Sequence, residues 1–592
     1  MKKMLRNKLA MLLANLKKKR PYYCEVEYLE STGTQYIDTG IVAKSGLSSV
    51  LNFEYTALSG TASMLDARSG NNRFYLCHTG KPSTTFFFYY GYGSAVQSSM
   101  TPTVNTRYLV ETSLAVGSQS MKVNGTTIAS GSSSITYNLG ANLYLFGMNY
   151  NTPQYLTSAK LYRCKIIDGS TLVRDFIPVL DWNYVPCMYD KVTGQLFYNA
   201  GTGSFLYGRE IHYVDYLESD GTQYIDTGIK LTNNHSVEVD YQLTSARQNR
   251  KGIFGGLVSN GSRFGTLLSP SNEYLEFGYG YSNVWYQTGL PDTQRHIMKQ
   301  QKNLLYFDGV LIHTFSTATF TQNFTAPLGS FAYTNYAPAS AKYYGSRWWD
   351  GNDLVRDYKP AIDENGVCFW FDKVSHSVFL NAGTGVFSYP ARETEYTGNA
   401  GTAAYIDLGA KYKPSMSIKG KYTRDTSGSQ GSVILVTTTT SAPLIYLPAL
   451  SGSTTERFVW RRGGYTEQSF FVNGITYPYT VEMVVDAVND TLTLNGNVVK
   501  TGMIAGMNGY NSPYQSDSNM YMFSIAGSYA GDGKVHYLKI KDGTTPLFDL
   551  MPAYKDGDAG FYNKVTGVFF KNASTNDSTY LVAGKIVEPE YE

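Results

Sequence analysis

The chain has 592 residues, which is enough for three or four domains that each bury a core of their own. Aromatic residues make up 15% of it, with 51 Tyr and 57 Gly, a composition typical of β-rich domains with many tight turns. The net charge is +3, but residues 1–20 hold eight Lys and Arg and no acid, so the remaining chain is mildly acidic and unsuited to binding nucleic acid along its length.

The first predicted element is a basic amphipathic anchor helix over residues 1–24. Its leucines fall on one helical face between flanking Lys and Arg: Leu5, Leu9, Leu12, Leu13 and Leu16. A signal peptide is not favoured, because the apolar stretch is short and lacks a small-residue cleavage site. A transmembrane span is not expected either, since no run of about 18 apolar residues occurs. Two uses remain open, docking of the leucine face on partner subunits and attachment to a membrane surface.

Two motifs occur three times along the rest of the chain. The opening motif reads EYLESTGTQYIDTGI at 27–41, DYLESDGTQYIDTGI at 215–229 and EYTGNAGTAAYIDLGA at 395–410. The closing motif lies at 172–205, 354–387 and 546–575. Each opener and closer enclose the length of a whole domain rather than of a solenoid repeat. The chain is therefore predicted to be a tandem array, a design more typical of binding and structural proteins than of enzymes.

The segments between the motifs are predicted to be short antiparallel strands. A hairpin signal recurs in MKVNGTTIA (121–129), LLYFDGVLIH (304–313) and LTLNGNVVK (492–500). Its Asn-Gly or Asp-Gly pair suits a two-residue turn in which both central residues need φ > 0. No helical periodicity follows residue 21, and short strands without helical crossovers predict antiparallel sandwiches.

The openers, hairpins and closers together resemble concanavalin A-like (laminin-G-like) jelly-roll domains, in particular those of structural and fibre proteins of phages and prophages of gut bacteria. The resemblance implies an all-β fold of three tandem antiparallel jelly-roll β-sandwiches over residues 25–210, 211–392 and 393–592. It also implies that the first and last strands of each sandwich lie side by side. The third copy departs from the pattern, since Phe548 replaces an Arg and NASTN replaces NAGTG.

Few residues have a pattern that indicates chemistry. The cysteines occupy unrelated places in the copies and predict neither disulfide bonds nor a metal site: Cys24, Cys77, Cys164, Cys187 and Cys368. No cofactor is predicted. Calcium at Asp532, Asp556 and Asp558 is a weak alternative, because turn chemistry already explains these residues. Glu238-Val239-Asp240 is the closest match to the paired acids of a glycosidase but lacks a third acid, so no catalytic residue is predicted.

The polar residues that recur in the motifs are interpreted as scaffold. Gln35 and Asp38 end the first strand, and the second copy repeats them; they are expected to satisfy backbone groups where the strand turns. The adjacent Arg174 and Asp175 also recur in the second copy and are expected to form a structural ion pair at the domain edge.

Aromatic strands provide the candidate ligand-binding residues. Aromatic-rich segments occupy comparable positions at 86–93, 273–286 and 456–470. Flat rings stack on sugars and anchor protein interfaces, although on a strand only every second ring faces outward. The residues predicted to contact a ligand are Trp349, Tyr279, Tyr281, Trp285, Tyr90, Tyr92, Trp460 and Tyr465.

Trp349 is the leading candidate among them. It lies in a strand that recurs in all three copies and falls where the third copy has Lys541, which indicates an outward position. The neighbouring Trp348 falls where the other copies have isoleucine and is expected in the core.

Together these features predict a non-enzymatic virion protein of fibre or decoration type. Residues 1–20 would dock it to another virion protein, and its lectin-like domains would bind host cell-surface polysaccharide. The resemblance implies a homo-oligomer, with trimers the usual form of such fibres. Synthesis in the host cytoplasm fits the missing disulfide framework. The alternative is a bacterial cell-surface or secreted carbohydrate-binding adhesin.

Overall fold

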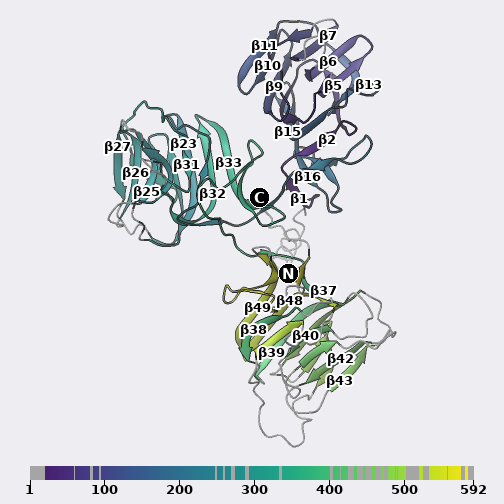
Figure 1. Ribbon diagram of the computed structural model, residues 1–592, viewed down its shortest axis with the longest axis vertical. Coiled ribbons are helices and arrows are strands. Elements are labelled where there is room, and N and C mark those ends of the chain that lie inside the picture. Colours follow the sequence, from purple (N-terminus) through teal and green to yellow (C-terminus); the bar gives the residue numbers. More distant parts are fainter. Residues whose placement is uncertain are drawn as a thin grey trace, which may run out of the picture. The chain divides into compact units, whose positions relative to one another are not determined.

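The computed structural model describes residues 20–584, with gaps at 59–60, 80–84, 93–94, 247, 249, 258–260, 269–273, 287–291, 333–336, 401–403, 412, 414, 425–431, 437–443, 448–455, 462–467, 473–477, 487–488, 490, 502–518, 524–531, 556–557 and 575–580. Their regular structure is entirely β-strand, which confirms the predicted all-β class (Figure 1). Among these residues no helix has the length and apolar character to cross a membrane.

The predicted N-terminal helix falls largely outside the described residues, as do its five leucines (Leu5, Leu9, Leu12, Leu13 and Leu16). Its predicted end at residue 24 is wrong, because residues 21–23 form bends and strand β1 (Cys24–Val26) begins at Cys24. Pro21 cannot donate the backbone hydrogen bond that a continuing helix needs. The backbone of Tyr23 instead donates to the carbonyl of Leu180, 2.7 Å away.

The first repeat forms two sheets around one core. The first sheet runs β11 (Thr126–Gly131), β10 (Ser118–Val123), β9 (Arg107–Ala115), β4 (Leu47–Tyr55), β15 (Ser158–Asp168), β16 (Thr171–Leu180), β17 (Pro186–Asp190) and β18 (Gln195–Phe197), with β1 on β16, β2 (Leu29–Thr32) on β15 and β19 (Leu206–Tyr207) on β2. The second runs β3 (Ile37–Lys44), β12 (Asn138–Leu145), β5 (Ala62–Ser69), β6 (Asn72–Thr79), β7 (Phe86–Tyr92) and β8 (Ala95–Gln97), with β13 (Met148–Tyr150) parallel to β5 and β14 (Thr152–Gln154) on β13.

The second repeat has the same strand order. Its first sheet runs β30 (Val310–Thr314), β29 (Leu304–Phe307), β28 (Arg295–Gln301), β23 (His235–Leu243), β32 (Ser340–Asp350), β33 (Asp353–Ile362), β34 (Cys368–Asp372) and β35 (Ser377–Phe379), with β20 (Glu210–Tyr213) on β33 and β21 (Leu217–Asp220) on β32. The second runs β22 (Ile225–Asp226), β31 (Pro327–Leu328), β24 (Gly252–Leu257), β25 (Arg263–Leu268), β26 (Leu275–Gly280) and β27 (Ser282–Tyr286).

The third repeat keeps this order as well. Its first sheet runs β46 (Asn497–Thr501), β45 (Thr491–Leu494), β44 (Tyr479–Asp486), β39 (Met416–Arg424), β48 (Asp532–Asp542), β49 (Thr545–Lys555), β50 (Asp558–Asn563) and β51 (Phe569–Lys571), with β36 (Arg392–Glu393) on β49, β37 (Thr397–Ala400) on β48 and β52 (Leu581–Ala583) on β37. The second runs β38 (Ile406–Lys411), β47 (Asn519–Phe523), β40 (Ser432–Val436), β41 (Leu444–Leu447), β42 (Glu456–Arg461) and β43 (Gln468–Val472).

The chain divides into two compact units, residues 1–388 and 389–592. The first unit holds two repeats and the second holds the third. The finer partition into domains at 25–210, 211–392 and 393–592 stays a prediction, because the first two repeats are hydrogen-bonded into one unit.

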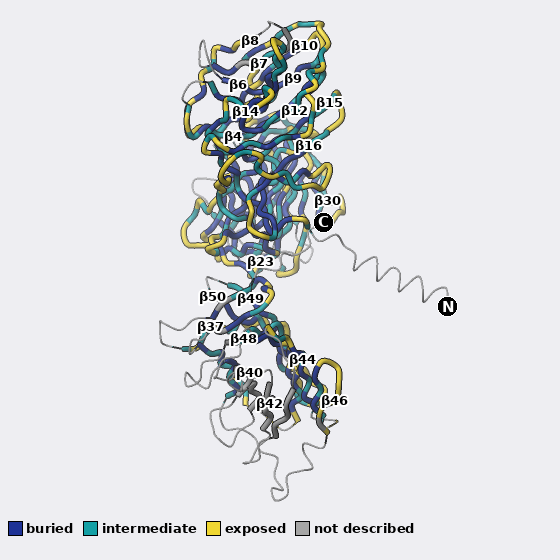
Figure 2. Tube along the Cα trace, turned by 90° about the vertical axis from the view of Figure 1, so that its right-hand side faces the viewer, coloured by how far each residue is buried: buried dark blue, intermediate teal, exposed yellow. Residues whose placement is uncertain are grey.

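Strict alternation of apolar and polar residues shows which face of a strand is turned toward the core. Every second residue of β4, in the sequence LSSVLNFEY, is buried and the residues between are half-exposed, as a strand with one covered face requires (Figure 2). In the second repeat, Phe254 of one sheet packs edge-on against Trp348 of the other, with ring centroids 6.2 Å apart. Trp348 is fully buried, as its sequence position predicts.

The three predicted hairpin turns are confirmed. Asn124 and Gly125, and their counterparts in the other repeats, all have positive φ, between 47° and 81°. They join β10 to β11, β29 to β30 and β45 to β46. This is the backbone of a type I′ turn, whose twist matches that of the flanking strands.

The closer lies against the opener of the same repeat, as the resemblance implies. The side-chain oxygen of Asn199 accepts hydrogen bonds from the backbone N–H of Tyr36 at 3.2 Å and of Gly201 at 2.9 Å. Asn381 and Asn572 accept the corresponding pairs in the second and third repeats. One asparagine therefore joins the two ends of each repeat, which explains why both ends recur so faithfully in the sequence.

Strand β1 also joins the first repeat to the second. One edge of β1 pairs with β16, and its other edge pairs with β20, where Glu25 lies opposite Ile211 and Val26 opposite Glu210. Strand β20 pairs in turn with β33 of the second repeat. The first sheets of both repeats are thus hydrogen-bonded through one antiparallel strand pair.

The turn 373–376 of the second repeat is held by side chains of the first. Arg163 donates to the carbonyls of Lys373 and Val374, at 2.9 and 3.0 Å. Arg107 donates to the next two carbonyls, those of Ser375 and His376, at 2.8 and 2.9 Å. These charge-assisted bonds give each of the four backbone carbonyls of the turn a partner in the first repeat.

His376 completes this contact from the other side. Its Nε2–H donates to the carbonyl of Val26 at 3.0 Å, and its φ is +54°. The other two repeats have Gly194 and Gly567 at this place, with φ of +72° and +74°. A histidine tolerates this left-handed conformation here because its ring bonds the first repeat.

We expect His376 to make the first unit sensitive to acid. Burial lowers the pKa of His376 to about 3, below the ordinary value of about 6.5. The unfolded chain therefore binds more protons than the folded one below pH 6.5, and stability falls as pH falls. At pH 5 His376 alone contributes a loss of about 2 kcal/mol, and His376→Gly removes this contribution. Urea unfolding of both proteins at pH 7 and pH 5 measures it; equal pH dependence would contradict the expectation.

A second prediction concerns the contact between opener and closer. A Cβ on Gly201 would lie 2.2 Å from the backbone oxygen of Thr34, so Gly201→Ala should destabilise the protein by about 1–3 kcal/mol. Gly345→Ala is the control, because its new Cβ would make only an ordinary contact, 3.5 Å from the carbonyl of Tyr358. Urea denaturation compares the two, and equal stabilities would contradict a close approach at Gly201.

Candidate functional site

The hairpin β26–β27 carries most of the predicted ligand-contacting residues that the structure describes. It lies at the edge of the second sheet in the second repeat (Figure 1). Gly280 and Tyr281 form its two-residue turn, in which Gly280 has a φ of +57°. A glycine at this first position suits a tight hairpin turn, and a Cβ there would meet Ala318 at 2.6 Å.

Trp285 and Tyr281 are exposed on this hairpin. Trp285 is 56% exposed and Tyr281 is 61% exposed. The half-buried ring of Tyr274 packs beside Trp285, with centroids 5.6 Å apart and planes tilted by 46°. This contact limits the rotation of the tryptophan and leaves much of its surface open to solvent.

Tyr279 does not belong to the exposed surface, so its prediction as a contact residue is wrong. It is 3% exposed and packs edge-on against Phe320 with centroids 5.2 Å apart. Burial raises the pKa of its hydroxyl above the ordinary value. The reason is the two-residue period of the strand, which turns Leu275, Phe277 and Tyr279 into the core together.

Three polar side chains lie beside Trp285 on the outer face. Glu276 is directly opposite Trp285 in the neighbouring strand, which places both on the same face. Its Oε1 accepts hydrogen bonds from Arg263 at 2.8 Å and from Asn283 at 2.9 Å. Asn283 is exposed, and the pair of Arg263 and Glu276 is mostly covered. The arrangement offers a flat ring next to a carboxylate, an amide and a guanidinium.

Glycine makes this arrangement possible. A Cβ on Gly278 would lie 2.5 Å from the side chain of Arg263, so only glycine lets that side chain cross the strand toward Glu276. In the first repeat the matching position, by strand register, is Tyr89. There the hydroxyl of Tyr89 accepts a hydrogen bond from Arg73, 2.9 Å away, and the ring of Tyr75 packs against it at 5.0 Å.

Trp349 is not brought to this surface. It lies on β32 in the other sheet, opposite Ser236, and is half-buried. The ammonium of Lys299 lies 4.8 Å from the centre of its ring. Trp349 therefore stays a predicted contact residue of a separate face, on which Lys299 and Arg347 lie near the carboxylate of Glu238.

The side chains of the remaining predicted contact residues lie outside the described part of the chain. Tyr465 lies outside the described residues, and the side chains of Tyr90, Tyr92 and Trp460 are also outside the description. Each of these three belongs to a described strand, β7 or β42.

The acids that could indicate a glycosidase are engaged in ion pairs. Asp240 receives two hydrogen bonds from Arg295, at 2.8 and 2.7 Å, which raise the pKa of that guanidinium. Glu238 lies 3.7 Å from the ammonium of Lys299 and 3.8 Å from Arg347. Both carboxylates thus act as partners of cations on a sheet surface.

The residues considered for calcium give no cluster among those described. Asp558 pairs with Lys571 at 2.8 Å, Asp556 lies outside the described residues, and the side chain of Asp532 is not described. All five cysteines fall within the described residues, and none of them is in a disulfide bond there.

The recurring polar residues of the motifs serve the scaffold. The side-chain oxygen of Gln35 accepts from the backbone of Thr32 at 2.8 Å, and Asp38 accepts from the backbone of Gly40 at 2.9 Å. Arg174 does not pair with the adjacent Asp175, since neighbouring residues of a strand point to opposite faces. It lies 3.6 Å from Asp190, and Asp175 pairs with Arg163 at 2.8 Å.

Sequence reasoning missed the polar residues around Trp285. Arg263, Glu276 and Asn283 come from three strands and have no shared motif. The sequence FGYGY held a signal that distinguishes the buried Tyr279 from the exposed Tyr281. A tight turn at Gly280 reverses the chain between them, so the two rings need not face the same side.

No protein-family model and no curated protein matches this chain. Among solved structures, domains LG4-5 of the mouse laminin alpha1 chain are similar, with 13% identity over 57% of this chain and 92% of that one, at a TM-score of 0.22. The LG1-3 region of the laminin alpha2 chain has 10% identity over 95% of this chain and all of that one, at 0.23. A Trypanosoma rangeli sialidase has 9% identity over 84% and 92%, at 0.17. TM-scores this low carry no inference, so the fold assignment rests on this chain's own strands.

The two tyrosines of the hairpin should respond differently to truncation. Tyr279→Ala removes a buried ring and should lower the free energy of unfolding by about 3–5 kcal/mol. Tyr281→Ala removes an exposed ring at the turn and should change it by no more than about 0.5 kcal/mol. Urea unfolding followed by tryptophan fluorescence tests both, and similar losses in the two variants would contradict this assignment of faces.

Proposed function

We propose that the protein is a non-enzymatic virion protein, of fibre or decoration type, whose lectin-like sandwiches attach to cell-surface glycans of the host. The observation that carries the glycan-binding part is the exposed Trp285 beside Glu276, Asn283 and Arg263. The virion part rests on the resemblance of the repeated motifs to phage structural proteins.

The surface around Trp285 has the two components that sugar recognition needs. A pyranose ring has an apolar face of C–H groups that stacks on an aromatic ring. Its hydroxyls both donate and accept, so they pair with a carboxylate, an amide and a guanidinium. Because Tyr274 already restrains Trp285 and Arg263 already fixes Glu276, little side-chain entropy is lost on binding.

A tandem array suits weak ligands. One sugar on one exposed surface buries little area, but several surfaces on one chain raise the effective concentration of each for a repetitive polysaccharide. Assembly into a homotrimer would multiply the surfaces again. Residues 1–20 would dock each chain to another virion protein, and a membrane surface is the alternative partner of that segment.

The binding surface is tested with a glycan array probed by the full-length protein. We expect wild type to bind a subset of glycans and Trp285→Ala to bind them about 10- to 100-fold more weakly, as for the loss of a central aromatic contact. Tyr198→Ala, which removes an exposed ring of the first repeat, is the matched control and should bind like wild type. Unchanged binding by Trp285→Ala, or a silent array, would overturn the glycan-binding part.

Native mass spectrometry and electron microscopy of the same protein test the virion part. A trimeric rod is expected of a fibre. A monomer made of separate beads would instead favour the adhesin.

A further inference from the structure

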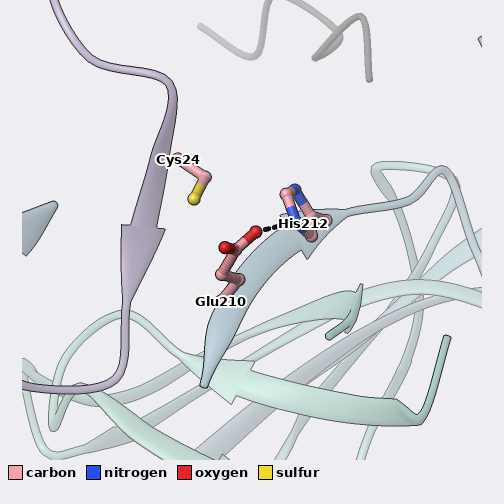
Figure 3. A group of neighbouring side chains, drawn as sticks. All are labelled: Cys24, Glu210 and His212. Carbon is pink, nitrogen blue, oxygen red and sulfur yellow. Dashed lines mark hydrogen bonds and ion pairs between the residues drawn. The ribbon is translucent and has the colours of Figure 1, made fainter. Parts of the chain in front are cut away.

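The strand pair that joins the first two repeats brings together three side chains that bind transition metals elsewhere in proteins. They are Cys24 on β1 and Glu210 and His212 on β20 (Figure 3). One ligand atom of each, a sulfur, a carboxylate oxygen and a ring nitrogen, lies within 4.8 Å of the others. Among the described residues this is a cluster far from the hairpin β26–β27 in sequence and in another sheet.

The register of the two strands dictates the cluster. Glu25 pairs with Ile211 and Val26 with Glu210, and continuing this register places Cys24 opposite His212. Residues directly opposite share a face, and Glu210 shares it too because it is two residues from His212. Cys24 and His212 also hold the same place in their repeats, three residues before the opening motif. The equivalent strands β1 and β20 thus pair with each other and bring the side chains of Cys24 and His212 close together.

We propose that Cys24, Glu210 and His212 form a zinc site that ties the first repeat to the second. Thiolate, imidazole and carboxylate are the ligands that Zn²⁺ prefers, and three protein ligands leave the fourth tetrahedral position for water. Ligand atoms around a tetrahedral zinc are about 3.5 Å apart. The three ligand atoms lie within 4.8 Å of one another, so they would move by about 1 Å when zinc binds. His212 Nε2 and Glu210 Oε2, now hydrogen-bonded at 2.8 Å, would separate by a similar amount.

Burial and charge fit an ion at this place. Cys24 is 0% and His212 is 1% exposed, whereas Glu210 is half-buried, so the ion would reach the site from the side of Glu210. Tyr23 packs edge-on against His212, with centroids 5.7 Å apart, and thereby orients the imidazole. A dication would compensate the charges of a thiolate and a carboxylate held in these surroundings.

The rest of the junction holds the ligands in place before any ion binds. Arg107 and Arg163 fix the turn 373–376, and His376 bonds the carbonyl of Val26, two residues from Cys24. The site therefore needs no folding step to form, and binding would stabilise the contact between the repeats.

The proposal is tested by metal binding to the full-length protein kept under reducing conditions. Wild type should bind one Zn²⁺ per chain in a titration and, with Co²⁺ as a spectroscopic substitute, show the thiolate-to-cobalt charge-transfer absorption. Cys24→Ala should lose that absorption and bind Zn²⁺ at least about tenfold more weakly. Cys164→Ser is the matched control and should leave both measurements unchanged. Cys164 pairs with Phe176, four residues along β16 from the Leu180 that pairs with Cys24, and the second repeat has Ser346 at its place.

His212→Gln gives a second readout if Cys24→Ala fails to fold. It keeps a polar side chain on β20 and should weaken Zn²⁺ binding at least about tenfold while the thiolate absorption with Co²⁺ shifts or disappears. A wild-type protein that shows no charge-transfer absorption would overturn the proposal. The same holds if His212→Gln binds both metals as wild type does. Neither result depends on glycan binding.

Discussion

In each repeat the carboxamide of one asparagine holds the closing loop against the opening motif. Asn199, Asn381 and Asn572 each accept hydrogen bonds from two backbone N–H groups that lie at opposite ends of their repeat. The loop approaches so closely that a Cβ on Gly201 or Gly383 would overlap the opener's backbone. Because every sandwich closes through this contact, its residues recur while the strands between them vary.

In the third repeat both residues of a scaffold ion pair are replaced by uncharged residues. Arg174 and Arg356 lie near Asp190 and Asp372, whose carboxylates are fully buried. The third repeat has Phe548 for the arginine and Asn563 for the aspartate, so no buried charge is left alone. Asn563 still accepts from the backbone of Asp549 and Val565, as Asp190 does from Asp175 and Val192. The side chain at this position therefore accepts the same two backbone hydrogen bonds in the third repeat, although it has no ion pair there.

The same scaffold positions carry different contacts in different repeats. Gly278 has no side chain and so leaves room for the side chain of Arg263 beside Trp285. Tyr89, at the same position in the first repeat, is hydrogen-bonded to Arg73. His376 stands where glycine stands in the other repeats and bonds the neighbouring repeat. Gly278 lies under the side chain of Arg263, and His376 lies in a turn against the first repeat. At these positions one repeat makes contacts that the others lack.

The sequence by itself determined the all-β class, the three hairpin turns and the buried Trp348, because these follow from local periodicity, turn chemistry and comparison between copies. The pairing of the two ends of each repeat was expected only from the resemblance of the motifs to laminin-G-like domains. The tertiary structure decided which ring of FGYGY faces solvent, since strand pairing and the Gly280 turn set the faces. It also decided that Arg174 meets Asp190, and that Cys24 meets Glu210 and His212. Those meetings depend on the register between distant strands, which no local pattern of residues records.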